Sequence, residues 1–227
     1  MIIAIEGLDG AGKHTQTVLA LKALIDRGID ATTGSFPRYG VSYYSAFIQE
    51  YLNGDYGNPA DVHPVLAGEL FIQERAEMKE WIKAKNDSSQ IFIIDRYSPS
   101  NIAYQVAKVK DGDRWVLAQS LVFKEHIKLG VPRPDVIIYL KWPVESCVGR
   151  IRSRALLNNR PEDEIEKNVN YLRAVGLVYA DTAFWHQQYP AAPYIIIDCQ
   201  KDGKDMTASE ISEQLVTKIL NYYTARI

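Results

Sequence analysis

The chain has 227 residues, of which 47% are hydrophobic and 24% are charged, and its formal net charge at pH 7 is −2. These values are typical of an ordinary soluble globular protein with one substantial core. No basic tract stands out and no apolar run approaches about 18 residues, so we expect neither a polynucleotide partner nor a membrane span.

Apolar runs that read as buried strands alternate with helical patterns along the chain. The predicted strands are Ile2–Glu6, Ala31–Phe36, Ile91–Asp95, Val136–Leu140 and Tyr194–Asp198. The predicted helices span residues 13–27, 41–53, 64–85, 98–107, 113–129, 143–157, 163–188 and 207–224. Most of these strands are apolar on both faces, as strands between two layers of helices are. We therefore expect an α/β fold in a single domain, 1–227, with a five-stranded parallel sheet and helices on both faces.

The first predicted strand runs into a glycine-rich loop that ends in lysine. Gly7, Gly10 and Gly12 allow sharp turns and close approach of a ligand, and Lys13 opens the helix that follows. Successive backbone N–H groups and the positive end of a helix dipole form an anion cradle, to which the lysine adds a charge. This pattern predicts a site for nucleoside triphosphates. The alternative is a plain turn with an exposed lysine.

The residue after the loop lysine departs from the usual pattern. That position normally holds a Ser or Thr that ligates Mg²⁺, whereas here it is His14, with Thr15 one place later. Either the metal is held differently, or the site binds nucleotide without turning it over. Asp95 ends a buried strand and therefore lies at the carboxyl edge of the sheet, where it can reach Mg²⁺ directly or through water.

Several short strings, taken together, resemble the thymidylate kinase family, which phosphorylates dTMP to dTDP with ATP. They are Leu8–Lys13, Phe36–Gly40, Phe71 with Arg75, Asp95–Tyr97, Ser100–Asn101 and Ala103–Gln105. The resemblance runs over nearly the whole chain and is strongest in residues 1–110. It implies a P-loop kinase fold, ATP as phosphoryl donor, Mg²⁺ as cofactor, dTMP as acceptor and a homodimer. Some members of the family also have a basic residue after the loop lysine.

On the donor side, the resemblance implies that the loop and two arginines bind ATP. These residues are Gly7, Leu8, Asp9, Gly10, Ala11, Gly12, Lys13, His14, Thr15, Arg150 and Arg154. Asp9 is unusual in such a loop, and by resemblance it lies near the acceptor's sugar hydroxyl and the metal. The plainer interpretation of Asp9 is a turn or helix-capping residue.

On the acceptor side, the resemblance implies a dTMP pocket. It would comprise Asp9, Phe36, Arg38, Tyr39, Phe71, Arg75, Arg96, Ser100, Asn101 and Tyr104. Arg96 would hold the acceptor phosphate, Phe71 would stack on thymine and Arg75 would donate to a ring carbonyl. Asn101 suits the imide edge of the base, and Tyr104 would crowd the place of a 2′-hydroxyl. Arg38 either joins Arg96 or is a solvated surface residue.

Residues 150–163 form a charged segment that we expect to interrupt the helical pattern and act as a lid. Arg150 and Arg154 are four residues apart and would project together onto the transferred phosphoryl group, with Arg152 and Arg160 nearby. The alternative is a solvated arginine face. Asp163 and Glu166, just beyond, match acidic positions of the family. The candidate metal ligands are Asp9, Asp95 and Glu166.

The expected function is phosphorylation of dTMP to dTDP, with Lys13, Arg96, Asp9, Arg150 and Arg154 as the catalytic residues. The alternatives are another nucleoside monophosphate or deoxynucleoside kinase on the same scaffold, or a non-catalytic nucleotide-binding module. A GTPase-like switch would need an Asn-Lys-x-Asp motif, but Lys-Trp-Pro follows the strand that ends at Leu140.

The two cysteines, Cys147 and Cys199, have neither metal-site spacing nor the number that a disulfide framework needs. We expect the first strand to begin at residue 2, which would leave no room for a signal peptide. Both features predict a reduced, cytoplasmic protein.

Overall fold

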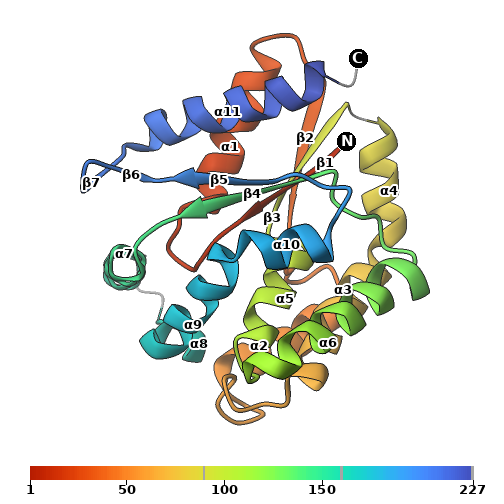
Figure 1. The fold of residues 1–227 in the computed structure, drawn as a ribbon, viewed down its shortest axis with the longest axis vertical. Coiled ribbons are helices and arrows are strands. Elements are labelled where there is room, and N and C mark those ends of the chain that lie inside the picture. The colour runs from red at the N-terminus through yellow and green to blue at the C-terminus, as the bar shows by residue number, and fades with distance from the viewer. Residues whose placement is uncertain (89, 159–160, 226–227) are drawn as a thin grey trace.

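A computed structural model describes residues 1–88, 90–158 and 161–225 (Figure 1). Its centre is a parallel sheet of β1 (Ile2–Glu6), β2 (Ala31–Ser35), β3 (Ile91–Asp95), β4 (Val136–Lys141) and β5 (Tyr194–Asp198), in the order β2-β3-β1-β4-β5. The predicted fold class and all five predicted strands are confirmed. The middle strand is β1, so the loop that follows it leaves the sheet at its centre.

The sheet is buried because its strands carry apolar side chains on both faces. Side chains of alternate residues point to opposite faces of a strand. Ile3 and Ile5 belong to a cluster that includes Leu24, whereas Ile2 and Ala4 belong to a smaller cluster under the other face. In Figure 1, α1 (Lys13–Ile25) and α11 (Ala208–Thr224) cover one face, and α5 (Ser98–Val106), α10 (Thr182–Gln188) and their neighbours lie on the other.

Two predicted long helices are in fact broken. The segment predicted as 64–85 forms α3 (Pro64–Glu77) and α4 (Lys79–Ser88). The segment predicted as 163–188 forms α8 (Glu164–Lys167), α9 (Val169–Ala180) and α10. In this second case the breaks have a clear cause, because Asp163, Asn168 and Asp181 each accept a hydrogen bond from a backbone N–H three residues later and so begin a new helix.

The remaining helices match their predicted positions with shifted ends. They are α1, α2 (Tyr44–Asn53), α5, α6 (Asp111–Val122), α7 (Val144–Asn158) and α11. The segment predicted as 113–129 continues from α6 into a π-helical stretch, η1 (Phe123–Lys128). A short hairpin of β6 (Gln200–Lys201) and β7 (Lys204–Asp205) was not predicted. The expectation that 150–163 interrupts a helix is wrong for 150–158, which is the last part of α7.

Within the three described stretches of chain, no helix is both long and apolar enough to cross a membrane.

The loop after β1 depends on glycine where α7 approaches it. Gly10 has φ +77°, and a Cβ atom there would lie far inside van der Waals contact with the carbonyl oxygen of Cys147 in α7. Gly12 has nearly the same backbone angle, φ +78°, but a Cβ atom there would meet open space. The two glycines therefore share a backbone requirement, and only Gly10 has a steric one.

We expect Gly10→Ala to lower the free energy of unfolding by roughly 2–5 kcal/mol, because it adds a backbone clash to the left-handed strain. Gly12→Ala is the matched control and should cost only the strain of about 1–2 kcal/mol. Urea unfolding of both variants measures the difference. Equal losses would contradict the close approach of α7 to the loop.

Candidate functional site

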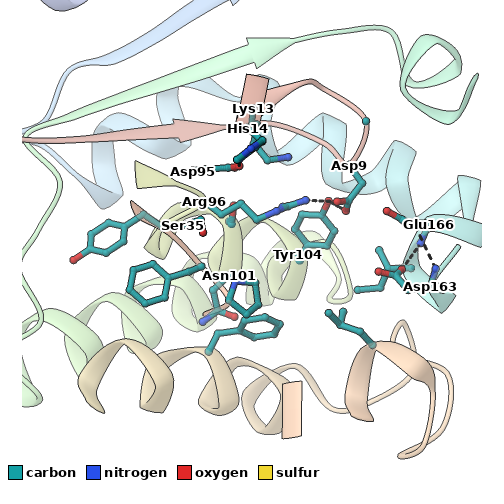
Figure 2. A pocket seen from close by; sticks show the side chains of 18 of the residues that line it. Asp9, Lys13, His14, Ser35, Asp95, Arg96, Asn101, Tyr104, Asp163 and Glu166 are labelled. Carbon is teal, nitrogen blue, oxygen red and sulfur yellow. Dashed lines mark hydrogen bonds and ion pairs between the residues drawn. The ribbon is translucent and has the colours of Figure 1, made fainter. Parts of the chain in front are cut away.

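A cavity of about 650 Å³ opens at the carboxyl edge of the sheet, between the loop after β1, α3, α5 and the segment around α7 and α8 (Figure 2). The structure gathers most of the predicted site residues around it. They are Asp9, Gly10, Gly12, Lys13, His14, Thr15, Phe36, Tyr39, Phe71, Arg75, Asp95, Arg96, Ser100, Asn101, Tyr104, Arg150, Arg154 and Glu166. The predicted residues that do not line it are Gly7, Leu8, Ala11 and Arg38.

The glycine-rich loop is preorganised to receive an anion. The Lys13 Nζ atom donates hydrogen bonds to the carbonyl oxygens of Gly7 (3.0 Å) and Leu8 (2.8 Å), so these two residues support the loop from behind. Burial, with the nearby Arg96 charge, lowers the pKa of Lys13 to about 8. Gly12 begins α1 without any side-chain cap, which leaves the first N–H groups of this helix available to a ligand.

Asp9 connects the loop to the other side of the cavity. Its carboxylate forms an ion pair with Arg96 and accepts a hydrogen bond from the Tyr104 hydroxyl at 2.7 Å, as Figure 2 shows. Burial opposes ionisation of Asp9, but the charges of Arg96 and Lys13 outweigh it and lower its pKa to about 2. Arg96 has φ +63°, a strained angle for a non-glycine residue, directly after β3. Such strain is frequent at functional sites.

A flatter, less polar part of the cavity lies against α3 and α5. Phe71 meets Tyr51 edge-on with ring centroids 6.1 Å apart. Asn101 donates from Nδ2 to the Gly68 carbonyl at 3.1 Å, while its Oδ1 atom is buried and has no protein partner. Arg75 is 1% exposed and lines the same region. A planar ring with polar edges suits this arrangement.

Ser100 lines the cavity, but its hydroxyl already donates to Glu6, a residue that we did not predict as part of the site. Glu6 also accepts hydrogen bonds from the Tyr97 backbone N–H (2.9 Å) and the Tyr179 hydroxyl (3.1 Å). Burial raises the pKa of Glu6. The sequence feature that could have identified Glu6 is its position as the acidic residue of an otherwise apolar strand, just before the loop. In the structure, Glu6 fixes the start of α5 against β1.

Arg38 differs from its expected position beside Arg96. Its guanidinium carbon lies 3.8 Å from the centroid of the Trp81 ring, an attractive cation–π geometry, and it lines a separate cavity of about 240 Å³. Its backbone N–H donates to Glu74 at 2.5 Å. Tyr39, the next residue, does line the main cavity. Glu74 therefore anchors the loop that presents Tyr39.

The predicted lid arginines take different positions. Arg150 donates from Nε to the Gly10 carbonyl at 2.7 Å and stacks 3.7 Å from the Trp142 ring centroid. Arg154 forms an ion pair with Glu166. Arg152 is exposed, and Arg160 lies outside the described residues.

Asp163, which caps α8 together with Glu166, lines the cavity. Burial and the charge of Asp9 raise its pKa to about 7.

The predicted metal ligands are not gathered into one cluster. In the part of the chain that the structure describes, no three His, Cys, Asp or Glu side chains are arranged to hold a metal ion. Asp9 and Glu166 are each paired with an arginine. Asp95 has a buried Oδ1 atom without a protein partner, and its other oxygen lies 4.0 Å from His14 Nδ1.

The family model for thymidylate kinase matches residues 5–189. This chain belongs to the thymidylate kinase family. It is 34% identical over 184 residues to a thymidylate kinase of Mycobacterium tuberculosis, covering 81% of this chain and 86% of the relative. It is 30% identical over 224 residues to a thymidylate kinase of Thermosipho melanesiensis, covering 96% and 99%.

The solved structure of a thymidylate kinase from Candida albicans superimposes with a TM-score of 0.65 and 21% identity, covering 97% of this chain and 91% of the other. At this identity the likeness concerns the fold, which is that of a P-loop kinase. Membership of the thymidylate kinase family, expected from the local strings, is confirmed by the match over residues 5–189.

Glu74 makes the free energy of unfolding depend on pH. It is fully buried, its Oε2 atom has no partner, and burial raises its pKa from 4.5 to about 7, although the Arg38 N–H opposes this. The folded state therefore keeps a proton that the unfolded chain releases near pH 4.5, and stability falls as the pH rises from about 4.5 to 7. We expect Glu74→Gln to gain up to about 3 kcal/mol over the parent between pH 4.5 and 8, measured by urea unfolding.

Glu77, three residues later, is the control of opposite sign. Although burial opposes it, hydrogen bonds from the Tyr43 N–H and the Ser42 hydroxyl lower its pKa. Glu77→Gln should therefore lose stability relative to the parent at neutral pH and regain it in acid. Parallel stability curves for Glu74→Gln and the parent would show that Glu74 is not held protonated.

Proposed function

We propose that this chain transfers the γ-phosphoryl group of ATP to the phosphate of dTMP. The supporting observation is a single cavity with an anion-binding group at each of two places, Lys13 with the loop amides on one side and Arg96 on the other, and a planar-ring pocket beyond Arg96. Phosphoryl transfer needs little covalent help beyond two phosphates held in line with their charge neutralised. The acceptor oxygen is already ionised, so no general base is required.

On the donor side, the loop from Gly7 to Thr15 would hold the ATP phosphates through its N–H groups and Lys13. Lys13 is buried and tied to two carbonyls, so its charge is fixed in place before the nucleotide binds. Fixed charge in a site closed to water stabilises a transition state more than a mobile surface charge does.

On the acceptor side, Arg96 would either leave Asp9 to bind the dTMP phosphate or bind the phosphate and Asp9 at the same time. Phe71 would stack on thymine, and Arg75 and Asn101 would read its edge. The Asn101 Oδ1 atom, which lacks a protein partner, matches a ring N–H donor. Tyr104 is fixed by its bond to Asp9 and would leave no room for a 2′-hydroxyl group.

The residues fit a Mg²⁺ ion, since the buried Asp95 Oδ1 atom has no protein partner and carboxylate oxygen is the ligand that Mg²⁺ prefers. Asp95 would hold it, and Asp9 or Glu166 would join only after leaving its arginine partner. When bound, Mg²⁺ supplies positive charge to the donor phosphates.

We further propose that the segment 150–163 acts as the lid. Arg154 would leave Glu166 for the transferred phosphoryl group, while Arg150 remains close to the loop through Gly10. The Arg154 side chain is 36% exposed, so it can reach a ligand from the pair, while the buried Glu166 carboxylate keeps a hydrogen bond from the Asp163 N–H.

The test is an ADP-release assay with ATP, Mg²⁺ and a panel of acceptors. We expect turnover with dTMP and slower turnover with dUMP, because a methyl group is worth about 1–3 kcal/mol. UMP and thymidine should be poor acceptors, because the first carries a 2′-hydroxyl and the second lacks the phosphate. Lys13→Ala and Arg96→Ala should each lower kcat by ~10²-fold or more.

The control is Lys22→Ala, which removes an exposed lysine of the same helix α1 and should leave kcat unchanged. Circular dichroism establishes that the variants are folded. Turnover of thymidine in preference to dTMP, or parental activity in Lys13→Ala, would refute the proposal.

We also propose that the protein is a homodimer. Exposed apolar side chains gather on α3 and along one side of α6 and η1, which are neighbours in Figure 1: Val65, Leu66, Val116, Phe123 and Ile127. The last three are separated by seven and four residues and so share one helix face. The free cysteines Cys147 and Cys199 are both buried, which agrees with the reduced, cytoplasmic location that we propose.

Phe123→Glu should convert the dimer to a monomer, because it buries a charge in an apolar interface. Light scattering after size-exclusion chromatography measures the mass. Leu177→Glu places the same charge at an exposed leucine of α9 and should leave the dimer intact. A parent protein that elutes as a monomer at micromolar concentration would refute the proposal.

A further inference from the structure

The base end of the cavity contains an ion pair that is completely buried. Arg75 of α3 donates from Nε to Glu125 Oε1 at 2.5 Å and from Nη2 to Glu125 Oε2 at 2.9 Å. Both side chains are 2% exposed or less. The pair is bidentate, the geometry in which guanidinium and carboxylate planes fix each other most strongly.

Glu125 reaches Arg75 from η1, the π-helical stretch that follows α6. A π-helical turn contains an extra residue relative to an α-helix, so it changes which side chains face a neighbouring element. Irregular turns of this kind are frequent at functional sites. The neighbouring Lys124 turns to the surface, where it pairs with Glu69 of α3. The two α3–η1 ion pairs therefore differ mainly in burial and in contact with the cavity.

The Arg75–Glu125 pair changes what Arg75 can bind. An unpaired guanidinium in a cavity wall would attract an anion, including the phosphate of a nucleotide in the wrong orientation. Here Glu125 neutralises that charge and takes two of the N–H groups, and the Nη1 group has no hydrogen bond among those found in the described residues. What remains at the cavity is an N–H donor whose charge is compensated by Glu125, which suits an uncharged carbonyl oxygen.

Arg96 differs from Arg75 in its exposure to water. Its side chain is 21% exposed and its partner Asp9 is 21% exposed, so this pair can open to water or to an anionic ligand. The cavity therefore contains one arginine that is available to a phosphate and one that is not. This asymmetry defines which end of a nucleotide lies where.

We propose that Glu125 is a positioning residue that makes Arg75 specific for the 4-carbonyl group of the pyrimidine base. The inference rests on the proposed function. It predicts that loss of the Glu125 charge frees Arg75, weakens binding of dTMP and reduces discrimination against bases that lack this carbonyl, while the donor side is unaffected.

The test compares Glu125→Gln with the parent on dTMP and on 5-methyl-dCMP, which carries an amino group in place of the 4-carbonyl. We expect kcat/KM for dTMP to fall by between about tenfold and hundredfold, mainly through KM, with the KM for ATP unchanged. The preference for dTMP over 5-methyl-dCMP should fall by at least about tenfold. Glu69→Gln, which breaks the surface ion pair between the same two elements, should change neither quantity.

A double-mutant cycle separates a positioning role from a structural one. If Glu125 acts through Arg75, then adding Glu125→Gln to Arg75→Gln should have no further effect on the KM for dTMP or on base preference. Glu125→Asp keeps the charge but not the bidentate reach, and is measured in the same way if Glu125→Gln does not fold. It should raise the KM for dTMP while retaining part of the base preference.

The outcomes are distinguishable. A parent protein that does not phosphorylate dTMP refutes the proposed function. An active parent, with either Glu125 variant keeping the parental KM and base preference, refutes the role of Glu125 alone. Additive effects in the double variant also refute it, because they would show that Glu125 does not act through Arg75.

Discussion

The site depends on one carboxylate that is shared by its two halves. Asp9 belongs to the loop after β1, yet it pairs with Arg96 after β3 and accepts from Tyr104 on α5. Glu6, the last residue of β1 before the loop, also connects to α5, because it accepts hydrogen bonds from the Tyr97 N–H and the Ser100 hydroxyl. Two acidic residues on either side of Gly7, Glu6 and Asp9, thus hold the loop and α5 in a fixed relation. In-line transfer between two bound phosphates requires such a fixed relation.

A second constraint comes from α7. Because residue 10 is a glycine, the helix can approach the loop closely enough for Arg150 to bond to the Gly10 carbonyl, and Trp142 to bond to that of Ala11. A side chain at residue 10 would push this helix away. Arg150 of α7 therefore places a positive charge beside the loop.

The cavity is also organised by how its arginines are neutralised. Arg75 is paired with a buried acid, Arg96 with one that is 21% exposed, and Arg154, itself 36% exposed, with Glu166. An ion pair that excludes water exchanges partners only at high cost, whereas one near water exchanges easily. The degree of burial thus supports the three tasks that we propose for these arginines: a fixed donor to the base, a phosphate ligand, and a residue that can move to the transferred group.

The sequence by itself determined the sheet, the loop and most residues around the cavity. Runs such as Ile91–Asp95 are apolar on both faces, which predicts a buried strand. A glycine-rich loop between a strand and a helix, followed by lysine, is typical of a phosphate-binding site. Tertiary structure alone decided the partners of the polar groups. Glu125 and Glu74 lie far along the chain from the groups they bind, and no local pattern marks them. Glu6 stands out as the acidic residue of an apolar strand, but its partners on α5 could not be read from the sequence. Arg38, expected beside Arg96, likewise stacks on Trp81 and lines a separate cavity. Periodicity reports which face of an element is buried, but the pairing of buried charges depends on which elements meet in space.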